Sequence, residues 1–324
     1  MRPSMLRRRA VFGLASLLLS LGASAQPWPA RPVKVVVPFA AGSAVDVIAR
    51  TVFEQLATRL GQAIVVENRV GAGGTIAAGS VARAEPDGYT VLATTSAHTI
   101  APALYPALPY DLQRDFVAVA AMGITPFVLV VSPTRGFTTV RDLVEAAKAA
   151  PGSFNFASVG EGSASHLSAE RFRLSAGVDA QHVPFKGGPE AMTEVIAGRI
   201  DFFFVALGAA LPQIRSGRLA ALAVNGSARS STLPGTPTTA EAGVPGAEYP
   251  TWFGVFVPAG TPRGIVDKLG HATAIALREP GVRDRLAGLG VEPMTMTTDE
   301  FDAHVRKEAT INRALVDAIG LKAK

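Results

Sequence analysis

The chain has 324 residues, of which 48% are hydrophobic and 18% charged, and its formal net charge is +5. This composition indicates a protein with a large apolar core and excludes a disordered chain, while the length predicts about two domains. The absence of cysteine excludes disulfides, thiol catalysis and thiolate metal sites.

Residues 1–25 have the pattern of a secretory signal peptide. Four arginines come before an apolar run over 10–21, and residues 23–25 have the small-x-small form of a cleavage site. We therefore predict export, cleavage after Ala25 and a periplasmic mature chain; the paired arginines leave both the Sec and the twin-arginine route open. Removing the four arginines leaves a net charge of +1, so a nucleic-acid partner is not expected.

Strand-like and helix-like segments then alternate, which is typical of α/β architecture. The first group of predicted elements consists of a strand at 33–37, a helix at 46–60, a strand at 64–67, a helix at 75–84 and a strand at 89–94. Glycine-containing loops lead into both helices.

A second group repeats this order: a strand at 154–157, a helix at 164–175, a strand at 181–184, a helix at 189–197 and a strand at 200–205. In this alignment Ser43 corresponds to Ser163, and Gly73-Gly74 corresponds to Gly187-Gly188. Two similar α/β lobes are the simplest account, with a structural duplication as a hypothesis.

Two apolar strands predict how the lobes are joined. One lies at 122–133 and the other at 251–258, and the remainder of the chain reads as three helices and a short strand near Val291. We predict lobe one at 26–125 plus 251–324 and lobe two at 126–250. The two crossover strands would act as a hinge that closes the lobes around a ligand.

The start of the first helix in lobe one is a candidate anion site. Ser43 and Asp46 form the pattern S-x-x-D, which predicts a helix cap. The alternative is that the free N–H groups of residues 41–44 receive a carboxylate.

Lobe two has a comparable loop, GEGSASH, at 160–166. Ser163 or Ser165 is the predicted cap, and His166 lies in the first turn, where a cationic imidazole would oppose the helix dipole. Capping does not explain this histidine, so it is a candidate ligand residue, with a packed surface histidine as the alternative.

Enzyme motifs are not matched. Neither AAGSA nor GEGSA is the G-x-S-x-G elbow of hydrolases, and GAGGTI has Ile76 where the dinucleotide fingerprint has glycine. The five histidines do not have the spacing of metal ligands. We expect no catalysis, no metal and no cofactor.

The chain resembles the Bug family, the periplasmic substrate-binding receptors of tripartite tricarboxylate transporters. The resemblance covers nearly the whole mature chain and is carried by the motifs VPFAAGSAVDVIAR, ENRVGAGGTIAA, ARAEPDGYTVL, LPYDLQRDF, GEGSASHL, VPFKGGPEAMTEVIAGRID, LPGTPTTAEAGVPGAE and WFGVFVPAGTP. It implies a type II periplasmic-binding-protein fold (a Venus flytrap) of two α/β lobes that close on a small carboxylate without catalysis.

The resemblance also implies which residues contact the ligand, mostly through backbone amides and water. They are Phe39, Ala41, Gly42, Ser43, Asp46, Ser96, Ala97, Thr99, Ser158, Gly162, Ser163, Ser165, His166, Lys186, Gly187, Gly188 and Ala206. The chain departs from the family pattern at Ser43, Val45 and Val205-Ala206, where glycine, a small hydroxyl residue and a polar pair are common. Fewer polar groups imply a ligand less highly charged than citrate.

Three functions remain open at this point. The first is a monomeric periplasmic receptor that delivers a small carboxylate to the membrane subunits of a transporter. The second is a ligand sensor that presents its closed form to a sensor-kinase ectodomain. The third is a secreted hydrolase that uses Ser163 and His166.

Overall fold

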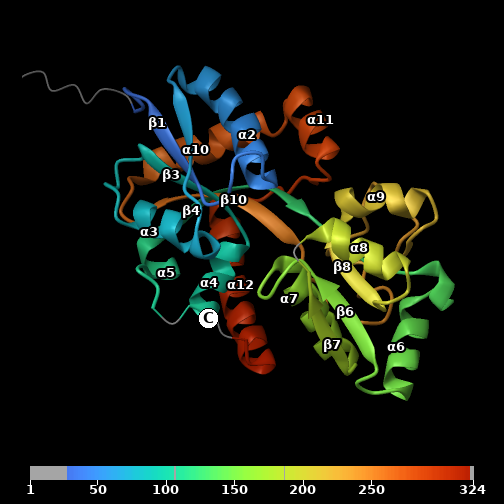
Figure 1. The fold of residues 1–324 in the computed structure, drawn as a ribbon. Helices are drawn as coiled ribbons and strands as arrows, with labels where there is room; N and C mark the ends of the chain where they lie inside the picture. Colours follow the sequence, from blue (N-terminus) through green and yellow to red (C-terminus); the bar gives the residue numbers. More distant parts are fainter. Residues whose placement is uncertain (1–27, 106, 186, 322–324) are drawn as a thin grey trace, which may run out of the picture.

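The computed structural model describes residues 28–105, 107–185 and 187–321. Two five-stranded sheets, each with helices on both faces, form two lobes (Figure 1). The predicted signal peptide, with its cleavage site, and Lys186 lie outside the described residues. Within the described ranges, no helix combines the length and apolarity needed to cross a bilayer.

The first sheet has the strand order β2-β1-β3-β10-β4. Its strands are β1 (Val33–Val37), β2 (Ile64–Asn68), β3 (Thr90–Thr95), β4 (Phe116–Thr125) and β10 (Thr251–Pro258). β1 is parallel to both β2 and β3, whereas β10 is antiparallel to both β3 and β4. A strand from near the end of the chain thus completes the sheet that the beginning of the chain forms.

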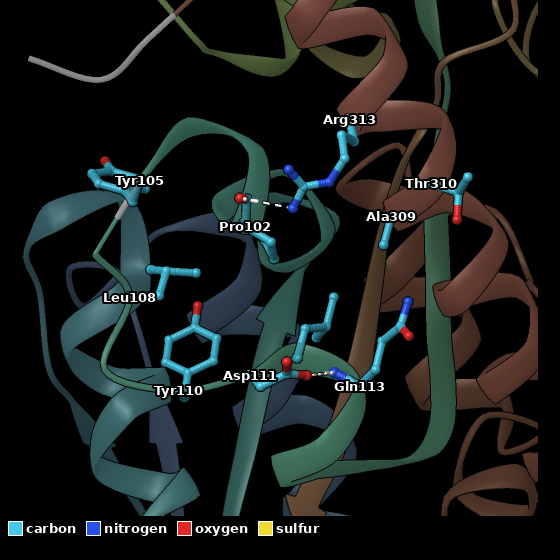
Figure 2. Close-up of a pocket in the computed structure, with 10 residues that line it drawn as sticks. Pro102, Tyr105, Leu108, Tyr110, Asp111, Gln113, Ala309, Thr310 and Arg313 are labelled. Atoms are coloured by element: carbon cyan, nitrogen blue, oxygen red, sulfur yellow. Dashed lines mark hydrogen bonds between the residues drawn. The ribbon is translucent and has the colours of Figure 1, made fainter.

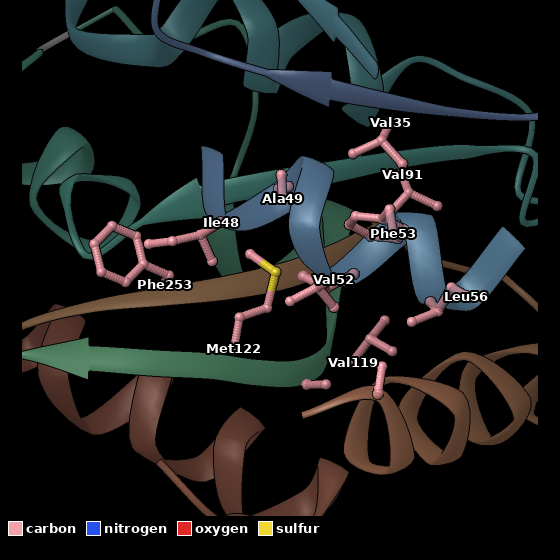
Figure 3. Packing of buried hydrophobic residues seen from close by; sticks show 14 of the residues in the cluster. Val35, Ile48, Ala49, Val52, Phe53, Leu56, Val91, Val119, Met122 and Phe253 are labelled. Atoms are coloured by element: carbon pink, nitrogen blue, oxygen red, sulfur yellow. The ribbon is translucent and has the colours of Figure 1, made fainter. Parts of the chain in front are cut away.

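Alternation along β1 builds two cores in this lobe, because successive side chains in a strand point to opposite faces. Val35 packs with α2 (Ala44–Leu60), α10 (Arg263–Ala276) and α11 (Pro280–Gly288), as Figure 3 shows for α2. Val36 faces the other way, into a core that also holds Trp252. Four helices lie on this second face: α3 (Thr75–Ala82), α4 (Ala97–Leu104), α5 (Leu112–Asp115) and α12 (Thr298–Ile319).

The second sheet repeats the arrangement of the first, with the order β7-β6-β8-β5-β9. Its strands are β5 (Phe127–Val131), β6 (Phe154–Ser158), β7 (Ala180–Pro184), β8 (Phe202–Ala206) and β9 (Ala220–Val224). Its helices are α6 (Val140–Ala149), α7 (Ala164–Ala176), α8 (Gly188–Ile196) and α9 (Leu207–Arg215). β6 is parallel to β7 and β8, as β1 is to β2 and β3, and β5 takes the antiparallel place that β10 takes in the first sheet.

The crossover segments differ in one respect from the sequence prediction. The apolar run 122–133 is not a single strand, because Pro126 separates β4 from β5 and the chain changes sheets there. Proline has no N–H to donate, so a break in pairing at this position is expected. We keep the predicted division, 26–125 plus 251–324 against 126–250, as a proposal about the units that move, and the sheet membership supports it.

Asn225, which is fully buried, connects the two crossings between the sheets. Its side-chain Oδ1 accepts from the N–H of Phe127, at the start of β5, over 2.7 Å. Its Nδ2 donates to the carbonyl oxygen of Tyr249, just before β10, also over 2.7 Å. A small apolar cluster of Ile100, Leu167 and Leu315 with Tyr249 packs α4, α7 and α12 together beside these crossings.

Candidate functional site

Two loops at the carboxyl ends of the parallel strands carry most of the predicted ligand residues. We call residues 39–46, between β1 and the first turn of α2, cup one. Residues 159–166, between β6 and the first turn of α7, are cup two. Each loop leads into a helix N-terminus, where free N–H groups and the helix dipole favour an anion.

Cup one is held by a buried carboxylate. Asp46, 2% exposed, accepts from the N–H of Gly42 over 2.9 Å, from Arg50 Nε over 3.0 Å and from Asn68 Nδ2 over 2.8 Å. Burial alone would raise the pKa of this carboxyl, but the hydrogen bonds from Arg50, Gly42 and Asn68 outweigh it and hold the pKa below its ordinary value. Both oxygens of Asp46 therefore bind groups of the protein itself and fix the shape of the cup.

The predicted cap at Ser43 is wrong. Ser43 occupies the N-cap position of α2, yet its side chain makes no capping hydrogen bond, and its Oγ is buried without a partner among the described residues. The side chain of Asp46 accepts instead from the N–H of Gly42, whose φ is +83°.

Cup two repeats the contact with an imidazole in place of the carboxylate. The N–H of Gly162 donates to His166 Nδ1 over 3.0 Å, and His166 Nε2 faces Glu170 Oε1 at 3.6 Å. An acceptor at Nδ1 assigns the proton of the neutral ring to Nε2. Both ring nitrogens therefore have partners within lobe two, and a direct bond from His166 to a ligand stays a prediction.

Glu170 continues this chain of contacts. Burial alone would raise its pKa, but the hydrogen bonds from His166 and from Arg173, whose Nε lies 2.8 Å away, outweigh it and lower the pKa. In cup two the neutral imidazole of His166 is thus followed four residues later by a carboxylate, whereas in cup one the carboxylate of Asp46 is followed by the cation of Arg50.

A second histidine lies against this cup. His182, on β7, stacks on His166 with ring centroids 3.8 Å apart, and its Nε2 is 2.6 Å from Ser158 Oγ. Burial and the neighbouring His166 lower the pKa of His182 to about 4. Ser158 is fully buried, so this serine–histidine pair has no access for a substrate.

The remaining serines of cup two hold its backbone. Ser163 Oγ accepts from the N–H of His166 over 3.3 Å and donates to the carbonyl oxygen of Gly160, so Ser163 is the cap of α7. Ser165 Oγ accepts from the N–H of Val159 over 3.0 Å. Because Nδ1 of His166 accepts from Gly162, that nitrogen is not placed to activate Ser163.

The other predicted residues differ in their accessibility. Thr99 is fully buried and its hydroxyl is bound to Ser96, Glu308 and Asn312, which places it inside the α4–α12 contact. Ser96 is 1% exposed, and its N–H donates to Trp252. The predicted residues left at least partly accessible are Phe39, Ala41, Gly42, Ser43, Ala97, Gly162, Ser163, Gly187, Gly188 and Ala206.

A surface hollow of about 470 Å³ lies elsewhere, between α4, α5 and α12 (Figure 2). It is lined by Pro102, Tyr105, Leu108, Tyr110, Asp111, Leu112, Gln113, Ala309, Thr310 and Arg313. None of the predicted ligand residues contributes to it. The described residues contain no group of three or more His, Cys, Asp or Glu side chains placed to hold a metal ion.

Two sheets of the same order, joined by two crossings and each carrying a helix N-terminus at its carboxyl edge, define a two-lobed α/β solute-binding protein. Residues 48–321 match the model of the tripartite tricarboxylate transporter family receptor. The chain belongs to this family of periplasmic receptors.

Individual relatives agree with this assignment. The protein BugT of Bordetella pertussis is 35% identical over 325 residues, which cover 99% of this chain and 100% of BugT. The R. palustris protein Rpa4515 with adipate is 34% identical, covers 91% of this chain and 99% of its own, and gives a TM-score of 0.74.

Two further solved structures are similar. MatC from Rhodopseudomonas palustris with bound malate is 35% identical over 89% of this chain and 100% of its own, with a TM-score of 0.71. A TctC solute binding protein from Polaromonas, with no ligand, is 28% identical over 90% of this chain and 99% of its own, with a TM-score of 0.83.

Proposed function

We propose that the chain captures a small carboxylate between its two lobes in the periplasm and delivers it to the membrane subunits of a tripartite transporter, without catalysis. The observation that carries this proposal is the pair of cups, each at the carboxyl edge of a sheet and at the N-terminus of a long helix. The adipate and malate bound by the two R. palustris relatives support a carboxylate as the ligand.

Closure is part of the proposal because one helix N-terminus is too weak alone. Each contributes about 0.3–1 kcal/mol, up to about 2 kcal/mol when partly buried, whereas a micromolar ligand needs about 8 kcal/mol. Amide and hydroxyl hydrogen bonds and apolar contact after closure supply the rest.

A matched pair of glycine variants tests the site. Gly42 and Gly61 lie at opposite ends of α2, both with positive φ and with open space where a Cβ would lie. Gly42→Val and Gly61→Val should each lose about 1–2 kcal/mol of folding free energy through backbone strain. Only Gly42→Val should also lose affinity for the carboxylate that calorimetry selects. Equal affinity in the two folded variants would place the site elsewhere.

Export and closure have their own measurements. Mass spectrometry of the periplasmic fraction should find a mature chain that begins at Gln26, and an unprocessed chain would contradict the signal peptide.

Small-angle scattering should give a smaller radius of gyration when a carboxylate is bound. Identical scattering curves with and without a carboxylate shown to bind would contradict closure.

A further inference from the structure

Six large apolar side chains are exposed among the described residues, and three of them lie at the edges of the two cups. These are Val70, 59% exposed, Ile76, 55% exposed, and Val159, 41% exposed. Exposed apolar side chains scattered singly over a surface need no explanation, whereas apolar surface gathered at one place marks a ligand-binding groove.

Val70 and Ile76 border cup one. Val70 follows the carboxyl end of β2 by two residues, and Ile76 lies in the first turn of α3. The glycine turn between them packs on the loop that leaves β1, since a Cβ at Gly74 would lie 3.0 Å from Pro38 Cβ. Segment 70–76 therefore lies directly beside the start of cup one.

Val159 lies at the start of cup two, and the end of α4 connects cup two to segment 70–76. Val159 is the first residue after β6. A Cβ at Gly162 would lie 3.4 Å from Leu104, and one at Gly73 would lie 2.8 Å from the hydroxyl of Tyr105, the next residue. Segment 70–76 and cup two thus lie against two adjacent residues at the end of α4, Tyr105 and Leu104.

The charges in these loops disfavour a highly charged ligand. Arg69 is paired with Glu67, whose carboxylate lies 2.5 Å from its Nε and whose pKa is lowered by that hydrogen bond. Glu161 is exposed in cup two and would repel a surplus carboxylate. The accessible side chains around the cups are otherwise mostly small or apolar.

We propose that the ligand is a carboxylate with an unsubstituted hydrocarbon body, and that Val70, Ile76 and Val159 select it against hydroxylated and tricarboxylic acids. This rests on the proposed function, in which the cups hold the carboxylate. On closure the three side chains would bury their exposed surface against the hydrocarbon, because removing apolar area from water is favourable. A ligand hydroxyl at the same place would lose its water without gaining a partner.

Calorimetry on the mature chain tests the ligand class. The panel pairs acids of equal length and charge, such as adipate with galactarate and succinate with malate, and adds citrate. We expect the tightest binder to be an unhydroxylated acid, at least about tenfold tighter than its hydroxylated counterpart. A hydroxylated or tricarboxylic acid as the tightest binder would overturn the proposal while leaving the proposed function intact. Failure of every carboxylate to bind would overturn both.

Isosteric variants test the residues. Val70→Thr and Val159→Thr should each weaken the tightest binder about tenfold, because a hydroxyl replaces a methyl at the contact. Val65→Thr is the control, since Val65 is 56% exposed but lies near the amino end of β2, away from the cups. All three positions are exposed, so folding should be retained. Equal affinity in the three variants would overturn the assignment of these side chains.

Discussion

In cup one the N–H of Gly42 meets a carboxylate, whereas in cup two the N–H of Gly162 meets an imidazole nitrogen. Four residues after each of these acceptors the two lobes carry opposite charges, the cation of Arg50 in lobe one and the carboxylate of Glu170 in lobe two. The two loops nevertheless have the same backbone form, because both glycines have positive φ. The backbone contact requires an acceptor at this place and tolerates very different chemistry in the residue that supplies it.

The largest difference between the cups should come from Asp46→Ala. This change leaves Gly42, Asn68 and Arg50 without their common acceptor, and hydrogen bonds to a charged group contribute about 1.5–3 kcal/mol each. Because Arg50 is half exposed, we expect a total loss of about 3 kcal/mol in urea unfolding. Asp46→Asn, which keeps one acceptor oxygen, should lose less. An unchanged unfolding midpoint in Asp46→Ala would show that the carboxylate does not hold cup one.

Exchanging the chemistry of the cups should have the next largest effect. His166→Asp places the acceptor of cup one into cup two, but its carboxylate then faces Glu170 across one helical turn. Like charges at this spacing are destabilising in the buried cup, and we expect a loss of about 2 kcal/mol. Adding Glu170→Gln should recover part of it in the same unfolding assay. If the double variant is no more stable than the single one, repulsion by the carboxylate of Glu170 is not the cause of the loss in His166→Asp.

Acid should weaken the folded chain through its buried histidines before it weakens the contacts of Asp46 in cup one. An unfolded histidine binds a proton near pH 6.5, while folded His182 does so only near pH 4. Between these values the unfolded chain holds more protons, so stability falls as pH falls. His98, fully buried, has its pKa lowered to about 3 and adds to this slope. Asp46, with a pKa below 3.8, keeps its contribution throughout this window.

Urea midpoints at pH 7, 6 and 5 measure this slope. His182→Gln should remove the share of this slope that His182 contributes. His98, His304, whose pKa is also lowered by burial, and Glu308, whose pKa burial raises to about 7 and whose slope has the opposite sign, are a background common to both chains. A slope identical to that of the wild type would contradict the assignment to His182.

The smallest effect separates the two serines. Ser163→Ala removes a cap and should cost about 1 kcal/mol. Ser43→Ala removes a hydroxyl that has no hydrogen-bond partner and should leave the thermal midpoint almost unchanged. Equal losses in both variants would mean that Ser43 caps α2 in solution.

The sequence predicted the alternation of strands and helices, the repeat and the position of both cups, because these depend on local periodicity and turn residues. It did not predict the contacts that hold the cups. S-x-x-D at Ser43 looks like the capping boxes that do form at Thr139 and Thr297. One of the groups that hold Asp46, the side chain of Asn68, comes from β2, and spacing within one helix carries no information about it.

The same limit applies to the histidines of lobe two. His166 and His182 stack because α7 starts beside β7, and nothing in their separation along the chain indicates it. Sequence reasoning therefore names His166 as a candidate ligand residue but carries no information about Gly162 and Glu170, which face its two ring nitrogens.

The amide of Asn225 joins the first crossing between the sheets, at Phe127, to the second crossing, at Tyr249. Two crossings held together by one buried side chain cannot shift independently, so under the proposed closure both change conformation together. A membrane subunit that contacts either crossing would therefore register the same event, whichever carboxylate the lobes enclose.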